Sequence, residues 1–193
     1  MNRKISVLFT MPGSVYESLG ADCWDEKRDA RKWPGGGPVV AHPPCRTWGK
    51  LSHFANAPAD EHSLALFAVD QVRRWGGVLE HPYGSRLWPE YLPLPGRVDL
   101  YGGFSVCVDQ FWWGHKAVKK TMLYVCGSKE KDLPLIPLRL DAVQYVVSTA
   151  RRLNKKGVFV RSSAKKEITK RERLATPPAF AGWLLEVAAM CDK

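Results

Sequence analysis

The sequence lacks the features that would place it in a membrane or outside the cell. No apolar run approaches the length of a membrane span, and the first residues lead into an expected strand, residues 5–10, rather than a secretion signal. The five cysteines are an odd set without paired spacing, which is atypical of a disulfide framework. These absences predict a protein of a reducing cytoplasm with no membrane partner.

Internal repeats and low-complexity tracts are also absent. Of the 193 residues, 45% are hydrophobic and eight are tryptophan, which argues against disorder. A chain of this length buries a sizeable core as one unit. We therefore expect a single α/β domain over residues 1–193.

Acidic residues are scarce, since 19 Asp and Glu oppose 29 Lys and Arg and leave a net charge of +10. The surplus gathers in residues 151–173, which hold ten Lys or Arg and two Glu. Concentrated positive charge favours a phosphate backbone, so DNA, duplex or single-stranded, is the predicted partner. The alternative is a solvated loop that keeps the protein soluble. The residues expected to contact nucleic acid are Arg161, Lys165, Lys166, Lys170 and Arg171.

Cys45 stands directly after a break in an apolar run. Residues 38–41 are typical of a buried strand, and Pro43 and Pro44 stop it. Proline fixes φ and removes a backbone donor, so Cys45 is expected in a stiff turn at the carboxyl end of the strand, where open α/β sheets bind ligands. A thiol held there and followed by Arg46 is a candidate nucleophile. The alternative is a small buried hydrophobe.

Glu80 has the same layout further along the chain. Residues 60–75 show the apolar spacing of an amphipathic helix, and glycines 76 and 77 end it. A short strand then delivers Glu80 before Pro82 stops it. A right-handed crossover puts Cys45 and Glu80 at the same end of one parallel sheet. The alternative role for Glu80 is an ion pair with an arginine such as Arg46.

A thiol and a carboxylate at one sheet edge suit the modification of a pyrimidine. The thiolate adds to C6, while the carboxylate, hydrogen-bonded at N3 and the exocyclic amine, stabilises the charge that develops on the ring. C5 then becomes nucleophilic and accepts a one-carbon group.

The same residues resemble those of DNA cytosine-C5 methyltransferases. Residues 43–45 resemble the family's Pro-Cys nucleophile motif, and residues 46–49 its mobile catalytic loop. Residues 79–82 are similar to its Glu-Asn-Val strand, residues 114–127 to its Gln-x-Arg-x-Arg segment, and residues 173–177 to the entry of its last helix. The chain as a whole resembles short phage-borne proteins described as methyltransferase-like.

The resemblance implies a role for each matching residue. It makes Cys45 and Glu80 the catalytic pair, places the substrate against Pro44, Arg46, His81, Lys119 and Lys120, and places the S-adenosylmethionine cofactor against Phe9, Gly13 and Asp25. It also implies the cytoplasm of a bacterial host if the protein is phage-encoded.

The cofactor region departs from the family. The family's turn after the first strand is Phe-x-Gly-x-Gly, whereas residues 10–14 contain one glycine. The next strand would end at Asp25, whose carboxylate suits a ribose diol. Too few residues follow Asp25 for the strand that helps cover the adenine. We therefore expect a trimmed sheet and weak S-adenosylmethionine binding.

A small basic insert, residues 128–173, occupies the place of the family's target-recognition domain. We expect a helix over residues 141–153 and a strand over 157–160 within it. So small an element suits phosphate contacts rather than the reading of a long sequence. Low sequence specificity, a free nucleotide substrate, or a partner that supplies specificity would follow.

Several other residues have structural and functional interpretations. His81 and His115 either orient the substrate or are hydrogen-bonded structural histidines. The aromatic residues 110–115 either stack on an extruded base or form a core plug. A zinc site assembled from His42, Cys45, His53 and His81 is disfavoured because the sequence has no closely paired ligands.

The sequence thus predicts a Rossmann-like, methyltransferase-type, mostly parallel sheet, trimmed at one edge, with helices on both faces. The leading functional hypothesis is C5 modification of cytosine in DNA, most simply methylation by S-adenosylmethionine. One alternative uses another one-carbon donor or a free pyrimidine nucleotide. Another is a catalytically inactive, methyltransferase-like DNA-binding protein.

Overall fold

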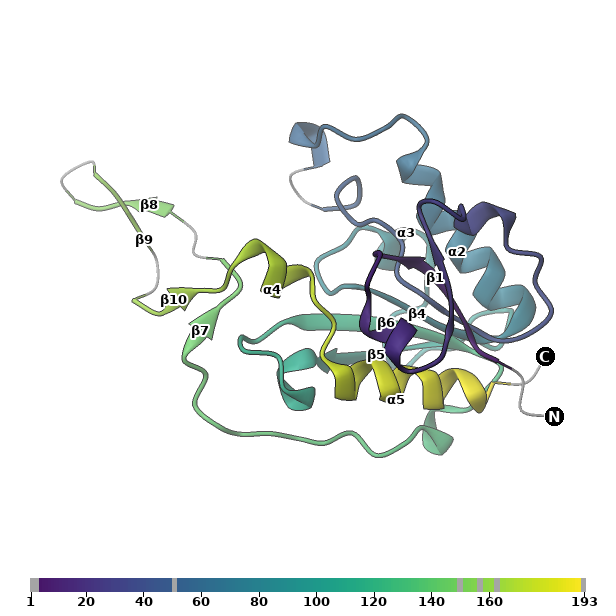
Figure 1. The fold of residues 1–193 in the computed structure, drawn as a ribbon. Coiled ribbons are helices and arrows are strands. Elements are labelled where there is room, and N and C mark those ends of the chain that lie inside the picture. Colours follow the sequence, from purple (N-terminus) through teal and green to yellow (C-terminus); the bar gives the residue numbers. More distant parts are fainter. Residues whose placement is uncertain (1–3, 50–51, 149–150, 156–157, 162–163, 192–193) are drawn as a thin grey trace.

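A mostly parallel six-stranded sheet organises the molecule (Figure 1). The structure, a computed structural model, describes residues 4–49, 52–148, 151–155, 158–161 and 164–191. The strand order is β2-β1-β3-β4-β6-β5. The strands are β1 (Ser6–Thr10), β2 (Asp22–Asp25), β3 (Val39–Ala41), β4 (Gly77–Pro82), β5 (Phe104–Asp109) and β6 (Lys120–Cys126). Strand β6 is antiparallel to both neighbours, and the other five strands share one direction. The expected α/β architecture is confirmed.

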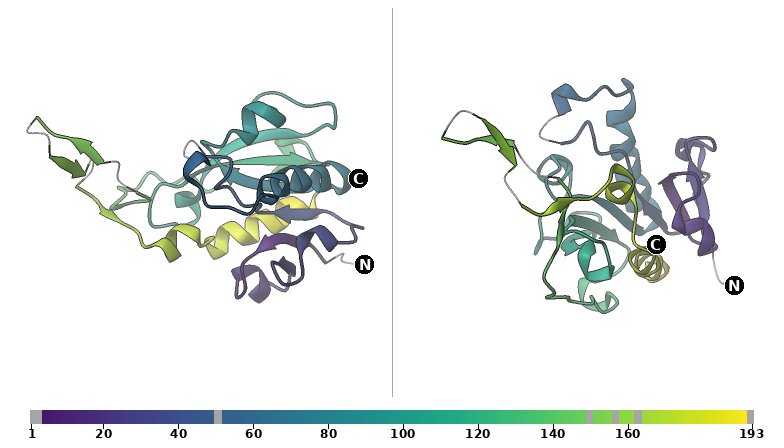
Figure 2. Two further views of the ribbon diagram at one scale, coloured as in Figure 1. Left: turned by 90° about the horizontal axis from the view of Figure 1, so that it is seen from above. Right: turned by 60° about the vertical axis from the view of Figure 1, so that its left-hand side comes forward.

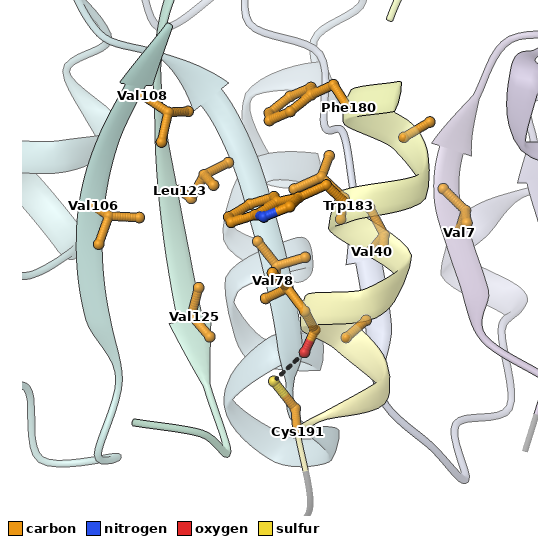
Figure 3. Packing of buried hydrophobic residues seen from close by; sticks show 14 of the residues in the cluster. Val7, Val40, Val78, Val106, Val108, Leu123, Val125, Phe180, Trp183 and Cys191 are labelled. Atoms are coloured by element: carbon orange, nitrogen blue, oxygen red, sulfur yellow. Dashed lines mark hydrogen bonds between the residues drawn. The ribbon is translucent and has the colours of Figure 1, made fainter. Parts of the chain in front are cut away.

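Helices cover both faces of the sheet. On one face lie α2 (Glu61–Trp75), as predicted from its apolar spacing, and the short α3 (Leu87–Tyr91). On the other lie α5 (Pro178–Ala189) and the single-turn α1 (Val15–Ser18). Figure 3 shows Phe180 and Trp183 of α5 over the valines of the sheet. Short 3-10 turns complete the connections: η1 (Ala30–Lys32), η2 (Ser52–Phe54), η3 (Gln110–Trp113) and η4 (Glu130–Asp132).

The sheet ends at β2, as the short spacing before β3 predicts. In the described part of the chain only the η1 turn lies between β2 and β3, and no strand pairs with the outer edge of β2. The crossover from β1 to β2 is equally short, because α1 has only four residues.

Gly77 sets the distance between β3 and β4. Its φ is +122°, and a Cβ built there would lie 2.0 Å from the carbonyl oxygen of Val39. Only glycine permits this approach, so the two strands that end near Cys45 and Glu80 are held in register at their other end.

The basic insert is a slender extension beside the sheet (Figures 1 and 2). Strand β7 (Tyr145–Val146) pairs with β10 (Lys166–Glu167), and β8 (Arg151–Leu153) pairs with β9 (Phe159–Arg161). The β8–β9 hairpin projects away from the sheet, and α4 (Lys170–Leu174) leads back to α5.

The prediction of a helix over residues 141–153 is wrong. Its described part is extended and forms β7 and β8, because a run rich in valine with Tyr145 fits a strand and finds a partner in β10. The strand expected over residues 157–160 is confirmed from Phe159 and extends to Arg161, while residue 157 lies outside the described residues.

No helix in the described residues combines the length and apolarity that crossing a membrane requires.

Candidate functional site at the carboxyl edge of the sheet

Cys45 lies on the surface just beyond the carboxyl end of β3. The backbone N–H of His42 still donates to the carbonyl of Leu8 on β1, at 3.1 Å, and the two prolines then divert the chain. The carbonyl of Cys45 accepts from the Trp48 N–H at 3.1 Å, which closes a turn. The thiol therefore has the strand-end position that the sequence predicts.

The Cys45 loop is fixed to the start of α2. Trp48 is fully buried, stacks on the His62 ring with centroids 3.9 Å apart, and donates from Nε1 to the His62 carbonyl. Arg46 donates from Nε to both carboxylate oxygens of the buried Glu61, at 2.7 Å each. Arg46 therefore pairs with Glu61, not with Glu80, and its predicted contact with substrate stays a prediction.

Glu80, at the carboxyl end of the neighbouring strand β4, is the centre of a polar network. Its Oε2 lies 3.0 Å from Nδ1 of His42. Its Oε1 accepts from the Thr121 hydroxyl and, at 3.2 Å, from Nε2 of Gln110. The side chain is only 14% exposed. Three elements of the sheet edge thus hold one buried carboxylate.

The charge state of Glu80 follows from these contacts. Burial alone raises the pKa of a carboxyl group, but the hydrogen bond and charge of His42, the Lys119 ammonium and the Thr121 hydroxyl lower the pKa of Glu80 to about 2. Glu80 is therefore an anion at neutral pH and can only accept hydrogen bonds.

The charge of Glu80 influences the pKa of both Cys45 and Lys119. Although Cys45 is at the surface, the surrounding protein partly removes water from its thiol. This desolvation and the Glu80 charge raise the pKa of the thiol, and Lys119 opposes them. Burial lowers the pKa of Lys119, while Glu80 and Cys45 oppose that effect. A hydrogen bond of 2.9 Å from the Lys119 backbone N–H to Asp109 fixes this segment. A thiol, a carboxylate and an ammonium group thus act on one another, and the resting thiol is protonated at neutral pH.

The other expected substrate contacts differ in accessibility. Lys120 is exposed at the start of β6, with Nζ 6.0 Å from the centre of the Tyr83 ring. Pro44 is partly exposed beside Cys45. His81 is fully buried, and burial lowers its pKa to about 4 against smaller opposing effects of Glu80 and the Pro44 carbonyl. Successive residues of a strand face opposite sides of a sheet, so His81 points away from the side that Glu80 occupies.

Of the three expected cofactor residues, Phe9 lies in β1, Gly13 in the turn after it and Asp25 at the end of β2. Phe9 has a φ of +63° at an irregularity in the β1–β2 pairing, a costly conformation for a non-glycine residue. Gly13, with φ +71°, donates its backbone N–H to Glu17 at 2.9 Å. Asp25 pairs in register with Thr10, and its Oδ1 accepts from the Arg28 N–H. The backbone amide of Gly13 in this loop is thus already bonded to the Glu17 carboxylate.

The residues expected to contact nucleic acid are spread along the insert. Lys165 precedes β10, Lys166 lies in it, and Lys170 and Arg171 begin α4, all with exposed side chains. Arg161 ends β9, and its side chain lies outside what the structure describes. The insert is joined to the sheet domain by the Lys116–Glu172 ion pair and by the Ala117–Tyr145 bridge.

The structural interpretations of His115 and the aromatic residues are supported. Nδ1 of His115 lies 2.7 Å from the Ala117 carbonyl, and the ring is buried. Trp113 is 7% exposed and packs against Phe180 and Trp183 with ring centroids 4.9 and 5.0 Å apart. Trp113 is thus part of the hydrophobic core beneath α5.

The sequence does not single out the partners of Glu80 as site residues. It offers His42 only as a zinc ligand, and Thr121 and Gln110 only as parts of longer segments. The signal that points to His42 is its place directly before the proline turn, at the same strand end as Cys45. Among the described residues no group of His, Cys, Asp and Glu is arranged to hold a metal ion.

Two grooves lie away from Cys45. One, of about 410 Å³, lies between the sheet domain and the insert and is lined by Val118, Tyr145 and Lys165 among others. The other, of about 540 Å³, lies beside α5 and is lined by Trp113, Leu135 and neighbouring residues.

No protein-family model matches the chain, and no curated protein matches it significantly.

Proposed function

We propose that the protein modifies C5 of cytosine in DNA through a covalent bond between Cys45 and C6 of the base. The observation that carries the proposal is the placement of two reactive groups at one sheet edge. Cys45 follows β3, Glu80 lies near the carboxyl end of the adjacent parallel strand β4, and the Glu80 charge raises the pKa of the Cys45 thiol. Residue types and positions match the catalytic pair that the resemblance to cytosine-C5 methyltransferases implies.

Each side chain of the cluster has a role in this chemistry. Cys45 is exposed, so its proton leaves to solvent when the thiolate forms, and the nearby Lys119 ammonium stabilises that anion. Glu80, held by Thr121 and Gln110, accepts a hydrogen bond from the exocyclic amine of the base. The anchoring of the Cys45 loop by Glu61 keeps the sulfur at a fixed position, which favours a defined approach to C6.

S-adenosylmethionine is the simplest one-carbon donor, and the residues fit it in part. Asp25 has one carboxylate oxygen engaged by the Arg28 N–H and a second that suits a ribose hydroxyl. Phe9, in its strained conformation, lies near the end of the adjacent strand β1, and Gly13 lies in the turn that follows it. When bound, the cofactor supplies an electrophilic methyl group. The short α1, the loop amide taken by Glu17 and the sheet edge at β2 favour weak binding.

A different one-carbon donor is the second candidate. The same observations favour it, because a loop with one glycine and an amide already bonded to Glu17 leaves little for a methionyl group to contact. Cys45 and Glu80 would keep their roles, since the addition to C6 does not depend on the identity of the donor.

Contact with DNA is supported by the basic insert. Lys165, Lys166, Lys170 and Arg171 are exposed on an extension that projects from the sheet domain (Figure 2). A projecting hairpin and exposed lysines suit the phosphate backbone, and the small size of the insert favours low sequence specificity.

Nucleoside mass spectrometry of DNA from cells expressing the protein tests this proposal. We expect a C5-modified cytosine that is absent from cells expressing the Cys45→Ala variant at the same level. The mass of the new nucleoside identifies the donor, because a methyl group and any other one-carbon group differ in mass. Unmodified DNA in both cultures would instead favour the catalytically inactive DNA-binding alternative.

A further inference from the structure

A hydrogen-bonded chain leads from Glu80 to the helix beside the expected cofactor loop. His42 contacts Glu80 through Nδ1, at 3.0 Å, and the Tyr16 hydroxyl through Nε2, at 2.7 Å. The His42 side chain is 14% exposed, and Tyr16, on α1, is 2% exposed. Both ring nitrogens of His42 are therefore occupied in a largely enclosed place.

Tyr16 suits a histidine that changes its protonation state. A hydroxyl oxygen accepts a hydrogen bond, so Tyr16 accepts from Nε2–H of the imidazolium and still accepts from it after Nδ1 has given up its proton. Burial, with Glu80 and Cys23, raises the pKa of Tyr16 well above its usual range, which keeps the hydroxyl protonated. Glu80 accepts from Nδ1–H of the imidazolium.

The charged surroundings of this chain are defined. Glu80 faces His42 from β4, and Tyr16 faces it from α1. Lys119, before β6, acts on Glu80 and on Cys45, and Cys23 on β2 acts on Tyr16. Among these groups His42 is the one that contacts both Glu80 and Tyr16 directly.

We infer that His42 holds the proton that Glu80 delivers to N3 of cytosine, so that Tyr16, His42 and Glu80 form the acid–base element of the site. The inference rests on the proposed function and deepens it. Glu80 alone is an acceptor, and the unprotonated N3 of cytosine is an acceptor too, so a proton is required between them.

Electrons and protons balance in this step. The Cys45 thiolate forms the C6–S bond, the C5–C6 π pair moves to C4–C5, and the C4–N3 π pair moves to N3. N3 takes a proton through the Glu80 carboxyl from Nδ1 of His42, which becomes neutral while Tyr16 continues to bond Nε2. C5 is now nucleophilic and exchanges its hydrogen with water. The reverse movement of electrons, with return of the N3 proton through Glu80 to His42, expels the thiolate.

Cytosine and uracil should respond differently to the loss of His42. Uracil already carries a proton on N3 and donates it to the Glu80 carboxylate, whereas cytosine needs one from the protein. His42 thus favours cytosine, and the preference should weaken as the pH rises and the pair loses its proton.

Release of tritium from C5 of cytosine or of uracil in otherwise identical DNA tests the inference without any donor. In the parent protein the cytosine-to-uracil rate ratio should fall as the pH is raised, and the ratio cancels the titration of Cys45. In His42→Gln, whose amide donates but does not titrate, we expect a loss of roughly tenfold or more for cytosine and a ratio independent of pH. His53→Gln, an exposed histidine, is the matched control.

The outcomes separate this inference from the proposed function. If the parent exchanges C5 hydrogen but His42→Gln keeps its pH-dependent ratio, or slows both bases equally, His42 is not the proton donor although the covalent chemistry stands. If the parent exchanges neither base, the proposed function fails and the inference with it. If His42→Gln does not fold, Tyr16→Phe decides: a cytosine-selective slowing supports the inference, and an unchanged ratio overturns it.

Discussion

Replacement of Glu80 by glutamine should make the stability difference between variant and parent depend on pH. The pKa of Glu80 falls from an ordinary 4.5 to about 2 in the folded protein. This shift corresponds to roughly 3 kcal/mol of stability at neutral pH. Because the folded-state pKa is the lower one, that stability is present above the unfolded pKa and is lost as the pH falls toward 2. About 2 kcal/mol should be gone by pH 3.

Urea unfolding of the parent and of Glu80→Gln, from about pH 6 down to about pH 3, measures this effect. Other carboxylates titrate in both proteins and cancel in the difference, which should shrink by roughly 2 kcal/mol across the range. His42→Gln should reduce the pH-dependent part, since His42 is the largest favourable contribution to the anion. A difference that stays constant with pH would refute the conclusion that Glu80 is held as an anion.

Three further predictions concern other parts of the molecule. Gly77→Ala should unfold the protein or separate β3 from β4, because its Cβ would meet the Val39 carbonyl; a melting curve like that of the parent would contradict this. Calorimetry should show weak S-adenosylmethionine binding that Asp25→Ala weakens further, and tight binding would mean that the pocket is more complete than its loop indicates. Replacing Lys165, Lys166 and Lys170 with alanine should flatten the dependence of log affinity for DNA on log salt by about 0.9 for each phosphate that the variant no longer neutralises; an unchanged slope would identify a solvated loop.

The positions of Cys45 and Glu80 were predictable because local chemistry fixes them. Proline at 43 and 44 ends one strand whatever the rest of the chain does, and the glycines at 76 and 77 end α2 and begin the next. The right-handed crossover then decides that both strand ends meet at one edge. Each step depends on residues close together in the sequence.

The partners of these residues were less predictable because they depend on tertiary register. Thr121 reaches Glu80 only because β6 pairs antiparallel with β4, and Gln110 only because η3 follows β5 at the same edge. The sequence offered Arg46 as an ion-pair partner for Glu80, yet the fold places Arg46 beside Glu61 at the start of α2. No local pattern distinguishes these pairings.

The helix expected over residues 141–153 shows the opposite case, in which a local pattern was ambiguous. Its described residues form strands because Tyr145 and its neighbours pair with β10 and with Ala117. Few of the described residues of the insert are buried, so a helix there would have no core against which to pack an apolar face. Hydrogen bonding between strands is therefore favoured.

Trapping with 5-fluoropyrimidines tests the central claim most directly, because fluorine at C5 blocks the elimination that would release Cys45. DNA containing 5-fluorocytosine should form a denaturation-resistant adduct with the parent protein, peptide mass spectrometry should locate it at Cys45, and Cys45→Ala should abolish it. The absence of an adduct with any 5-fluoropyrimidine, with or without S-adenosylmethionine, or an adduct that persists in Cys45→Ala, would contradict covalent catalysis by Cys45.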